Sequence, residues 1–173
     1  MKNFVMSSVA AVAMGAAAAA SAAPVTTSPG IGTMNVTAVV TAGCTDLTVG
    51  NLDFGTNPAA STTVDVPVDI LVTCNSNTSY TIELDYGANE VGVGQRQVTN
   101  DDNGEFIDYE IFQPAANGGA ATSLPWGTAA QGAEFVGTGT GGEQTLTATG
   151  RLQLTETNAA GTYTDIVTVT LSF

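Results

Sequence analysis

The sequence predicts an all-β sandwich domain, and three observations support this fold class. Strand-like stretches with period-two alternation recur at short intervals, and clusters of Gly, Asn, Asp and Pro separate them. No stretch beyond the N-terminal apolar run shows a sustained helical period. Cys44 and Cys74 form a single pair in a chain that we expect to be exported, which predicts a disulfide. A metal pair is the alternative, but the chain has no histidine and no third cysteine to complete such a site.

The first residues predict a cleaved export signal. Lys2 is followed by an alanine-rich apolar run over residues 4–20, and Ala20-Ser21-Ala22 fits the small-residue cleavage pattern. We expect residues 1–22 to be removed, with Ala23 as the first mature residue. A transmembrane anchor is the alternative, but an alanine-rich run of this length is weakly hydrophobic for a stable span.

The predicted strands follow one another along the mature chain. In chain order their inward-facing sets are Met34/Val36/Ala38/Val40, Val64 to Cys74, Tyr80 to Tyr86, Ile107 to Ile111, Leu146 to Leu154 and Tyr163 to Phe173. Pro67 predicts an edge or a bulge, because proline cannot donate a ladder hydrogen bond. Residues 114–142 are glycine-rich and predict loops with one short strand around Phe135. Residues 23–33 show no core pattern and predict a flexible leader.

The C-terminal stretch GTYTDIVTVTLSF, residues 161–173, has a distinct pattern. Its alternation predicts one half-buried strand that runs to the last residue, Phe173. Most domains finish in a few polar, frayed residues. A strand that stops on a large aromatic side chain therefore suggests that its neighbour in the sheet comes from elsewhere.

The charge composition argues against several functions. The chain has sixteen acidic residues, and after the signal its only basic residues are Arg96 and Arg151. Such a surface repels nucleic acid and anionic membrane. Without histidine, and without lysine after the signal, the commonest general base and Schiff-base nucleophile are missing. A glycosidase with a pair of catalytic carboxylates remains an alternative, although no spacing in the sequence singles out two of the acidic residues. We expect no enzyme, no catalytic residue and no cofactor.

An acidic cluster, TNDDNGEFIDYE at residues 99–110, has two interpretations. Four residues stand at the spacing of a calcium-binding loop: Asp101, Asn103, Gly104 and Glu110. The first position of such a loop would be a threonine here, and strands rather than helices flank it. An Asn-Gly turn between two strands explains the same letters. We favour the turn and predict no metal site.

Several short motifs occur in a fixed order. They are the alternating strand before Gly43-Cys44, LDFGT (52–56), VTC (72–74), YTIELDYG (80–87), Arg96, IDYEIF (107–112), PWG (125–127), TATGRL (147–152) and AGTYTDIVTVTLSF (160–173). In this order they resemble the spore coat protein U family, the pilin subunits of archaic (Csu-type) chaperone–usher pili. The resemblance covers essentially the whole mature chain. It departs in a longer leader and in Thr149, where an aromatic residue is common.

The resemblance implies an incomplete immunoglobulin-like β-sandwich that lacks its last strand and is completed by donor-strand complementation. A periplasmic chaperone would lend a strand to the open groove, and in the fibre the N-terminal strand of the next subunit would replace it. An outer-membrane usher and identical or related pilin subunits are the other implied partners. The implied donor residues are Met34, Val36, Ala38 and Val40. The implied acceptor edge consists of Val167, Val169, Leu171 and Phe173.

The predicted organisation is therefore a signal peptide (1–22), a leader with the donor strand (23–43) and a pilin domain (44–173). We expect a structural pilus subunit for adhesion and biofilm formation, which passes through the periplasm to the cell surface. An ordinary first strand of the domain would show the same alternation as a donor strand, so the sequence leaves both open. A secreted or spore-coat sandwich, lectin-like or adhesive, is the alternative function. Trp126, the sole tryptophan, would line a sugar pocket in that case, although core packing is its commoner role.

Overall fold

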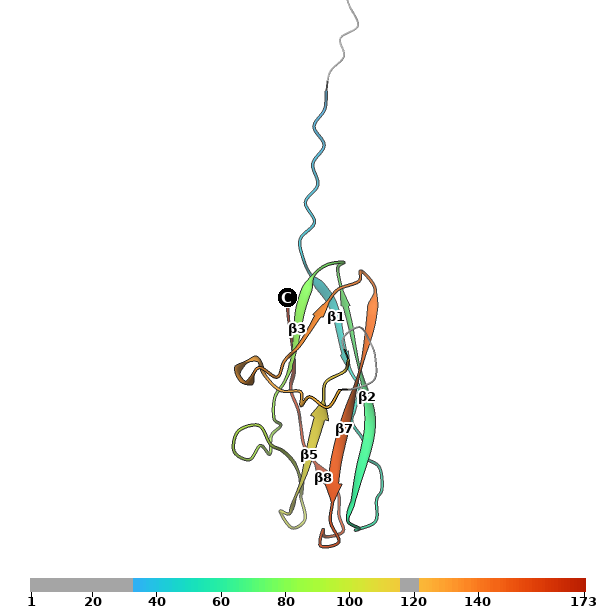
Figure 1. Ribbon diagram of the computed structural model, residues 1–173, viewed down its shortest axis with the longest axis vertical. Helices are drawn as coiled ribbons and strands as arrows, with labels where there is room; N and C mark the ends of the chain where they lie inside the picture. The colour runs from blue at the N-terminus through green and yellow to red at the C-terminus, as the bar shows by residue number, and fades with distance from the viewer. Residues whose placement is uncertain (1–32, 116–121) are drawn as a thin grey trace, which may run out of the picture. The chain divides into compact units, whose positions relative to one another are not determined.

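The computed structural model describes residues 33–115 and 122–173, in two units. One unit ends at Ala38, and the other, Val39 to Phe173, is a β-sandwich (Figure 1). The expected signal peptide (1–22) and residues 23–32 of the expected leader lie outside the described residues. Within the described ranges, no helix has the length and apolar character that crossing a membrane requires.

The sandwich unit is built from strands, as the alternation predicts. Over the residues that the structure describes, its elements are β1 (Cys44–Val49), β2 (Thr62–Cys74), β3 (Ser79–Leu84), β4 (Arg96–Asn100), β5 (Phe106–Phe112), the short 3-10 helix η1 (Ala129–Gln131), β6 (Phe135–Thr138), β7 (Glu143–Leu154), β8 (Tyr163–Thr164) and β9 (Val169–Ser172). The all-β fold class is confirmed.

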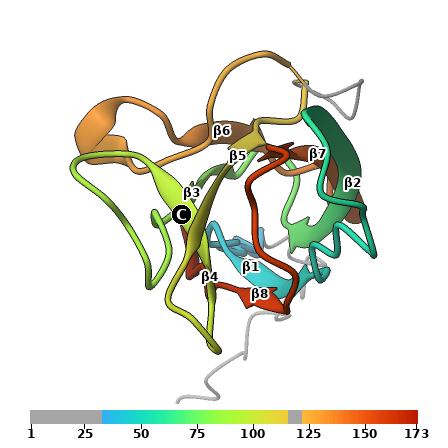
Figure 2. The same ribbon diagram turned by 90° about the horizontal axis from the view of Figure 1, so that it is seen from below.

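Two antiparallel sheets form the layers of the sandwich. Counted over the described ranges, one sheet has six strands in the order β1-β2-β7-β5-β4-β8, and the other has three in the order β6-β3-β9. Figure 1 shows β2, β7 and β5 side by side along the long axis. Figure 2, which looks along that axis, shows β8 beside β4 and the C-terminus beside β3. Two packed antiparallel sheets are the architecture of an immunoglobulin-like sandwich.

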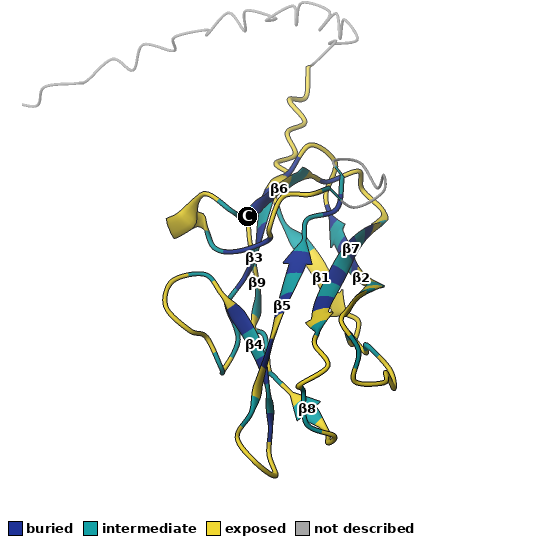
Figure 3. Ribbon diagram, turned by 60° about the horizontal axis from the view of Figure 1, so that its bottom comes forward, coloured by how far each residue is buried: buried dark blue, intermediate teal, exposed yellow. Residues whose placement is uncertain are grey.

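The core lies between the sheets and comes from the alternating side chains. Ile70 of β2 stands opposite Leu146 of β7, and Val68 stands opposite Ala148, so the same face of both strands is apolar. All four side chains are buried, and Figure 3 shows the buried positions recurring along β4, β5 and β7. Full burial of a Val, Leu or Ile side chain contributes roughly 1.5–3 kcal/mol relative to exposure. The inward alternation therefore fixes the register of the strands.

Pro67 lies in the middle of β2, where only one side of the strand is paired. It stands opposite Thr149 of β7, but β1 pairs only with the later part of β2. Gly50 N donates to Asp69 O at 2.9 Å, so the backbone of Asp69 faces the β1 side. Since alternate residues face the same neighbour, the nitrogen of Pro67 also points to that side, beyond the end of β1. Of the predicted edge or bulge, the structure shows a local edge: β2 is an inner strand, but it has no partner on this side at Pro67.

A close approach at Gly150 brings the segment after β1 onto the sheet. A Cβ on Gly150 would lie 2.5 Å from a methyl carbon of Leu52, closer than such atoms can stand. Glycine at this place in β7 therefore lets Leu52 of the LDFGT motif pack against the core. Phe54 follows two residues later, and its ring meets that of Tyr109 edge-on with centroids 6.1 Å apart.

The structure differs from the predicted elements at four places. β1 and β4 were not predicted. In β1 only Leu47 and Val49 stand at alternate positions, and the inward set of β4 begins and ends with the polar Arg96 and Asn100. Residues 33–43 form no strand. The single C-terminal strand is wrong: it divides into β8, in the six-stranded sheet, and β9, in the other sheet, and β9 ends at Ser172.

Cys44 and Cys74 form a disulfide with an S–S distance of 2.05 Å. Their Cα atoms are 3.9 Å apart, less than the usual range of about 4.4–6.8 Å. The two residues stand directly opposite each other in the β1–β2 pairing, which brings their backbones together. The bridge therefore fastens the edge strand β1 to β2.

Replacing both Cys44 and Cys74 with Ser is expected to lower the free energy of unfolding by about 3–4 kcal/mol, because the bridge closes a loop of 30 residues and restricts the unfolded chain. Urea unfolding of the oxidised wild type and the double variant measures the difference. A loss well under 1 kcal/mol would show that the bridge is dispensable.

Candidate functional site: an open groove between the sheets

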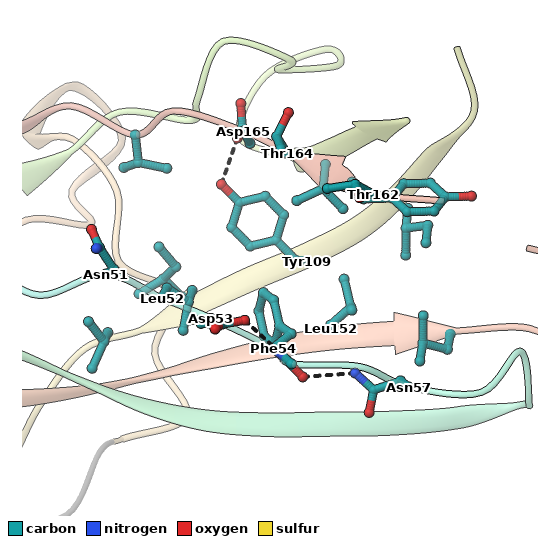
Figure 4. A pocket seen from close by; sticks show the side chains of 18 of the residues that line it. Asn51, Leu52, Asp53, Phe54, Asn57, Tyr109, Leu152, Thr162, Thr164 and Asp165 are labelled. Carbon is teal, nitrogen blue, oxygen red and sulfur yellow. Dashed lines mark hydrogen bonds between the residues drawn. The ribbon is translucent and has the colours of Figure 1, made fainter. Parts of the chain in front are cut away.

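A cavity of about 1220 Å³ opens between the two sheets of the sandwich. Its walls are the end of β1 with the segment that follows it, residues 49–59, and a C-terminal segment that includes residues 158–167. Core side chains form its floor: Val68, Ile70, Leu84, Ile107, Ile111 and Leu152. Figure 4 shows Leu52, Phe54 and Leu152 on one side of this space and Thr164 and Asp165 on the other. The groove therefore gives access to the apolar interior of the sandwich.

β9 forms one border of the groove, and its outer side is free. Over the described residues β9 pairs only with β3. Thr168 O accepts a hydrogen bond from Asp85 N at 3.0 Å, so the backbone of Thr168 faces the β3 side. Since successive residues of an antiparallel strand face opposite neighbours, the backbone groups of Val167, Val169 and Leu171 point to the free side.

β1 is the edge strand of the other sheet. In the described part of the chain it pairs only with β2. Gly50 N faces β2, so by the same alternation the backbone groups of Val49 point away from it. Val49 lines the cavity and is 43% exposed. The groove thus has an edge strand of each sheet in its neighbourhood, and apolar side chains lie beneath it.

The residues predicted for the acceptor edge occupy different places. Val167 and Val169 line the cavity and pack against the core. Leu171 also packs against the core, but it is not among the residues that line the cavity. Phe173 lies beyond the end of β9 and is 65% exposed.

The residues predicted for the donor strand lie outside the strands of the part of the chain that the structure describes. Met34, Val36 and Val40 are each 86% exposed, and Ala38 is also exposed. The alternation of these side chains is thus not used by any strand of the described residues. The donor strand over these residues therefore stays a prediction.

A polar cluster around Asp165 lies at the groove, and sequence analysis did not single it out. The hydroxyl of Tyr109, on β5, donates to Asp165 Oδ2 at 2.6 Å, as Figure 4 shows. Asp165 Oδ1 accepts from the backbone N–H groups of Ala88 and Asn89 at 2.9 and 3.2 Å, and from Asn89 Nδ2 at 3.1 Å. Burial raises the pKa of Tyr109, and the bond to Asp165 raises it further. The hydroxyl therefore stays protonated as a donor.

Gly87 makes room for this cluster. Its φ is 83°, a left-handed conformation that favours glycine, and a Cβ there would lie within 1.9 Å of Asp165 Oδ2. Gly87, the last residue of the YTIELDYG motif, thus lies against Asp165 of the C-terminal motif. The two motifs are far apart in the sequence, which is why their relation was not visible there.

Asp85 connects the end of β3 to the segment that leads into β9. Its Oδ1 accepts hydrogen bonds from the backbone N–H groups of Thr168, at 2.8 Å, and Gly87, at 3.0 Å. Burial opposes the charged form, but the bonds from Thr168 and Gly87 and the charge of Arg96 outweigh it and lower the pKa of Asp85. The charged carboxylate therefore stabilises the folded state.

Because the folded-state pKa of Asp85 lies below its unfolded value, its contribution is present above about pH 4 and is lost as the pH falls through the folded pKa. Asp85→Asn is expected to unfold more easily at neutral pH and to lose less further stability on acidification. Urea midpoints between pH 7 and pH 3 test this, with the exposed Asp102→Asn as the control. Equal acid losses in the wild type and in Asp85→Asn would contradict the assignment.

Arg96 and Trp126 belong to a buried network of hydrogen bonds in the core. Arg96 is 0% exposed, and its Nη1 donates to Glu110 Oε1 at 2.7 Å. Its Nη2 donates to the backbone oxygens of Asp85 and Trp126 at 2.6 and 2.7 Å. Trp126 is also 0% exposed, and its Nε1 donates to Ile82 O at 2.8 Å. Trp126 is thus a core residue, and the sugar-pocket interpretation is wrong for it.

The cluster at residues 99–110 forms the predicted turn. Gly104 has φ 71°, and its N–H donates to Asn100 O at 2.8 Å between β4 and β5. Glu110, the predicted last ligand of a calcium loop, instead binds Arg96 from within β5. In the described residues, no group of three or more His, Cys, Asp or Glu is placed to hold a metal ion.

Comparison with known proteins identifies the family. The Spore Coat Protein U domain matches residues 31–170. Among solved structures, one similar chain belongs to the CsuC–CsuE chaperone–tip adhesion subunit pre-assembly complex from archaic chaperone–usher Csu pili of Acinetobacter baumannii. The two chains are 21% identical with a TM-score of 0.55, over 78% of this chain and 40% of that chain, so this likeness shows the fold alone. Comparison with curated proteins gives no match. Because the domain match covers most of the chain, the protein belongs to the Spore Coat Protein U domain family.

Proposed function

We propose that the protein is a structural subunit of a surface pilus, assembled by the chaperone–usher pathway through donor-strand exchange and serving adhesion and biofilm formation. The observation that carries the proposal is the groove beside the free edge of β9. Val167 and Val169 offer backbone groups along this edge, and the apolar floor offers space for alternate side chains. These are the two requirements for adding a β-strand to a sheet.

The incoming strand in the fibre is residues 34–40 of the next subunit. Its apolar side chains alternate, as those of an inserted strand must, and they are exposed in this chain. Burying Met34, Val36 and Val40 in a groove stabilises the contact by roughly 5–8 kcal/mol, with less from Ala38. Backbone hydrogen bonds along β9 add to this, and slow release suits a fibre held by kinetic stability.

A chaperone partner follows from the same groove. A free strand edge beside an apolar cavity is an aggregation hazard until it is covered. The similar solved chain comes from a complex of a chaperone with a pilus subunit, which supports a periplasmic chaperone as the first occupant here. An outer-membrane usher and related subunits complete the pathway. Residues 1–22 would direct the chain to the periplasm, and the pilus would carry it to the cell surface.

A secreted or spore-coat sandwich that binds a ligand is the alternative function. Burial of Trp126 removes the aromatic residue that favoured a lectin-like site. The groove is lined by core residues, and its polar groups at Asp165 are already hydrogen-bonded. Both observations favour a strand over a sugar as the occupant.

Deletion of the gene tests the proposal. Wild-type cells should carry fibres that an antibody against the sandwich unit labels along their length in electron microscopy, and the deletion strain should lack them. Biofilm mass should fall in the same strain and return on complementation. Secreted, unassembled protein with no labelled fibres would favour the alternative function.

A further inference from the structure

The chain crosses between the two sheets within the C-terminal motif. β8 pairs with β4 in the six-stranded sheet, and β9 pairs with β3 in the other sheet. Residues 165–168, here termed the crossover, therefore pass from one layer of the sandwich to the other beside the groove. Asp165, Ile166 and Val167 of the crossover line the cavity. A strand that pairs along β9 and continues beside Val167 thus meets the start of the crossover, at Asp165, where the chain leaves β8.

The crossover is fixed at both ends by carboxylates. At its first residue, Asp165 binds Tyr109 of β5 on one side and the backbone of Ala88 and Asn89, after β3, on the other. Asp165 therefore joins the two sheets through its single side chain. At the far end, Asp85 holds the backbone N–H of Thr168 at 2.8 Å. The segment is held in one place although it belongs to no strand itself.

Alternation alone cannot fix how far a strand slides into the groove. Side chains of a strand repeat with period two, so a slip of two residues leaves every apolar side chain of residues 34–40 facing the core. The four inward residues are similar in character, so the apolar floor discriminates weakly between such registers. Something at one end of the groove must set the position.

Resting on the proposed function, we infer that the crossover, pinned by the Tyr109–Asp165 bond, is the stop that sets the register of the inserted strand. Tyr109 and Asp165 are then positioning residues: they hold the crossover in place, and the crossover halts the strand. Without this bond, residues 165–168 can move. The inserted strand can then bind in registers that differ by two residues. The assembled subunit would keep its fold and lose its single register.

The experiment reads the register directly. A synthetic peptide of residues 33–43 with benzoylphenylalanine in place of Met34 is bound to the mature chain during refolding. Val36→Asp and Val40→Asp in that chain prevent it from using its own segment. After irradiation, mass spectrometry locates the cross-linked residue. The variants are Tyr109→Phe, which removes only the hydroxyl, and Asp165→Asn. Asp69→Asn is the matched control, because that carboxylate accepts a bond from Thr147 on the outer face of the same sheet.

In the wild-type background and in Asp69→Asn, one cross-linking site should dominate by about tenfold or more. In Tyr109→Phe, cross-links at sites two residues apart should appear in comparable yield. We expect the free-energy difference between the two registers to be about that of one charge-assisted hydrogen bond, which this variant removes. An unchanged single site in both Tyr109→Phe and Asp165→Asn would overturn the stop while leaving the proposed function intact. No cross-link to the groove in the wild-type background would overturn the proposed function and the stop with it. If Asp165→Asn fails to fold, Tyr109→Phe decides.

Discussion

Val169→Asp is expected to prevent the subunit from accumulating in the periplasm. Val169 lines the groove, packs against the core and offers its backbone to the free edge of β9. A carboxylate at this position would be buried by any strand that covers the groove, at a cost of several kcal/mol. The chaperone should then fail to hold the subunit, and the uncovered edge should lead to aggregation or degradation. Immunoblots of periplasmic extracts and co-purification with the chaperone measure both effects. Leu171→Asp should act in the same direction.

Thr170→Asp is the matched control for this change. Thr170 is the next residue of β9, and its exposed side chain points away from the core. It receives the same charge in the same strand, so it reports any general effect of acidity on β9. Wild-type accumulation of Thr170→Asp with loss of Val169→Asp supports a groove at this edge. Normal accumulation of Val169→Asp would place the strand-binding site elsewhere.

The sequence predicted the parts of the fold that depend on alternating apolar residues. β2, β3, β5 and β7 have such sets, and the structure confirms each of them. The disulfide between Cys44 and Cys74 could also be predicted, because one cysteine pair in a chain that we expect to be exported offers few alternatives. The strands follow from the burial of apolar side chains that alternate within a short stretch of sequence. The disulfide follows from the presence of a single pair of cysteines.

What the sequence could not predict depends on buried polar groups. β4 was missed because the inward positions at its two ends are Arg96 and Asn100, which alternation of apolar residues does not detect. The division of the last strand was missed because Asp165 continues its alternation, although this carboxylate binds Tyr109 rather than packing in a core. Hydrogen bonds over such sequence distances leave no local pattern. The acceptor edge was predicted at Val167, Val169, Leu171 and Phe173, of which the first two line the groove, whereas the polar end of the groove required the structure.

Val36→Asp is expected to block fibre formation while the subunit still folds with its chaperone. Val36 is the second of the alternating residues of the proposed donor strand, and its side chain is 86% exposed in this chain. If the strand is donated, the subunit's own core does not need Val36, so the change should leave the subunit's unfolding midpoint close to that of the wild type. In the fibre the same carboxylate would enter the groove of the neighbour and lose its solvation, at a cost of several kcal/mol. Assembly should therefore fall by more than about a hundredfold.

Thr37→Asp separates burial in the neighbour's groove from a general effect of charge. Thr37 adjoins Val36 and lies on the opposite face of the alternation, so a donated strand would leave its side chain outside the groove. Chaperone-bound subunits of both variants are purified, their unfolding is measured, and their polymerisation is followed by electron microscopy. A donor strand requires that Thr37→Asp assembles and Val36→Asp does not, with similar stability for both. If Val36→Asp instead destabilises the single subunit, residues 34–40 belong to its own core. Fibres of wild-type yield from Val36→Asp would rule out donation through this segment. A groove lined by core side chains cannot accept an unpaired charge without a large loss of binding free energy.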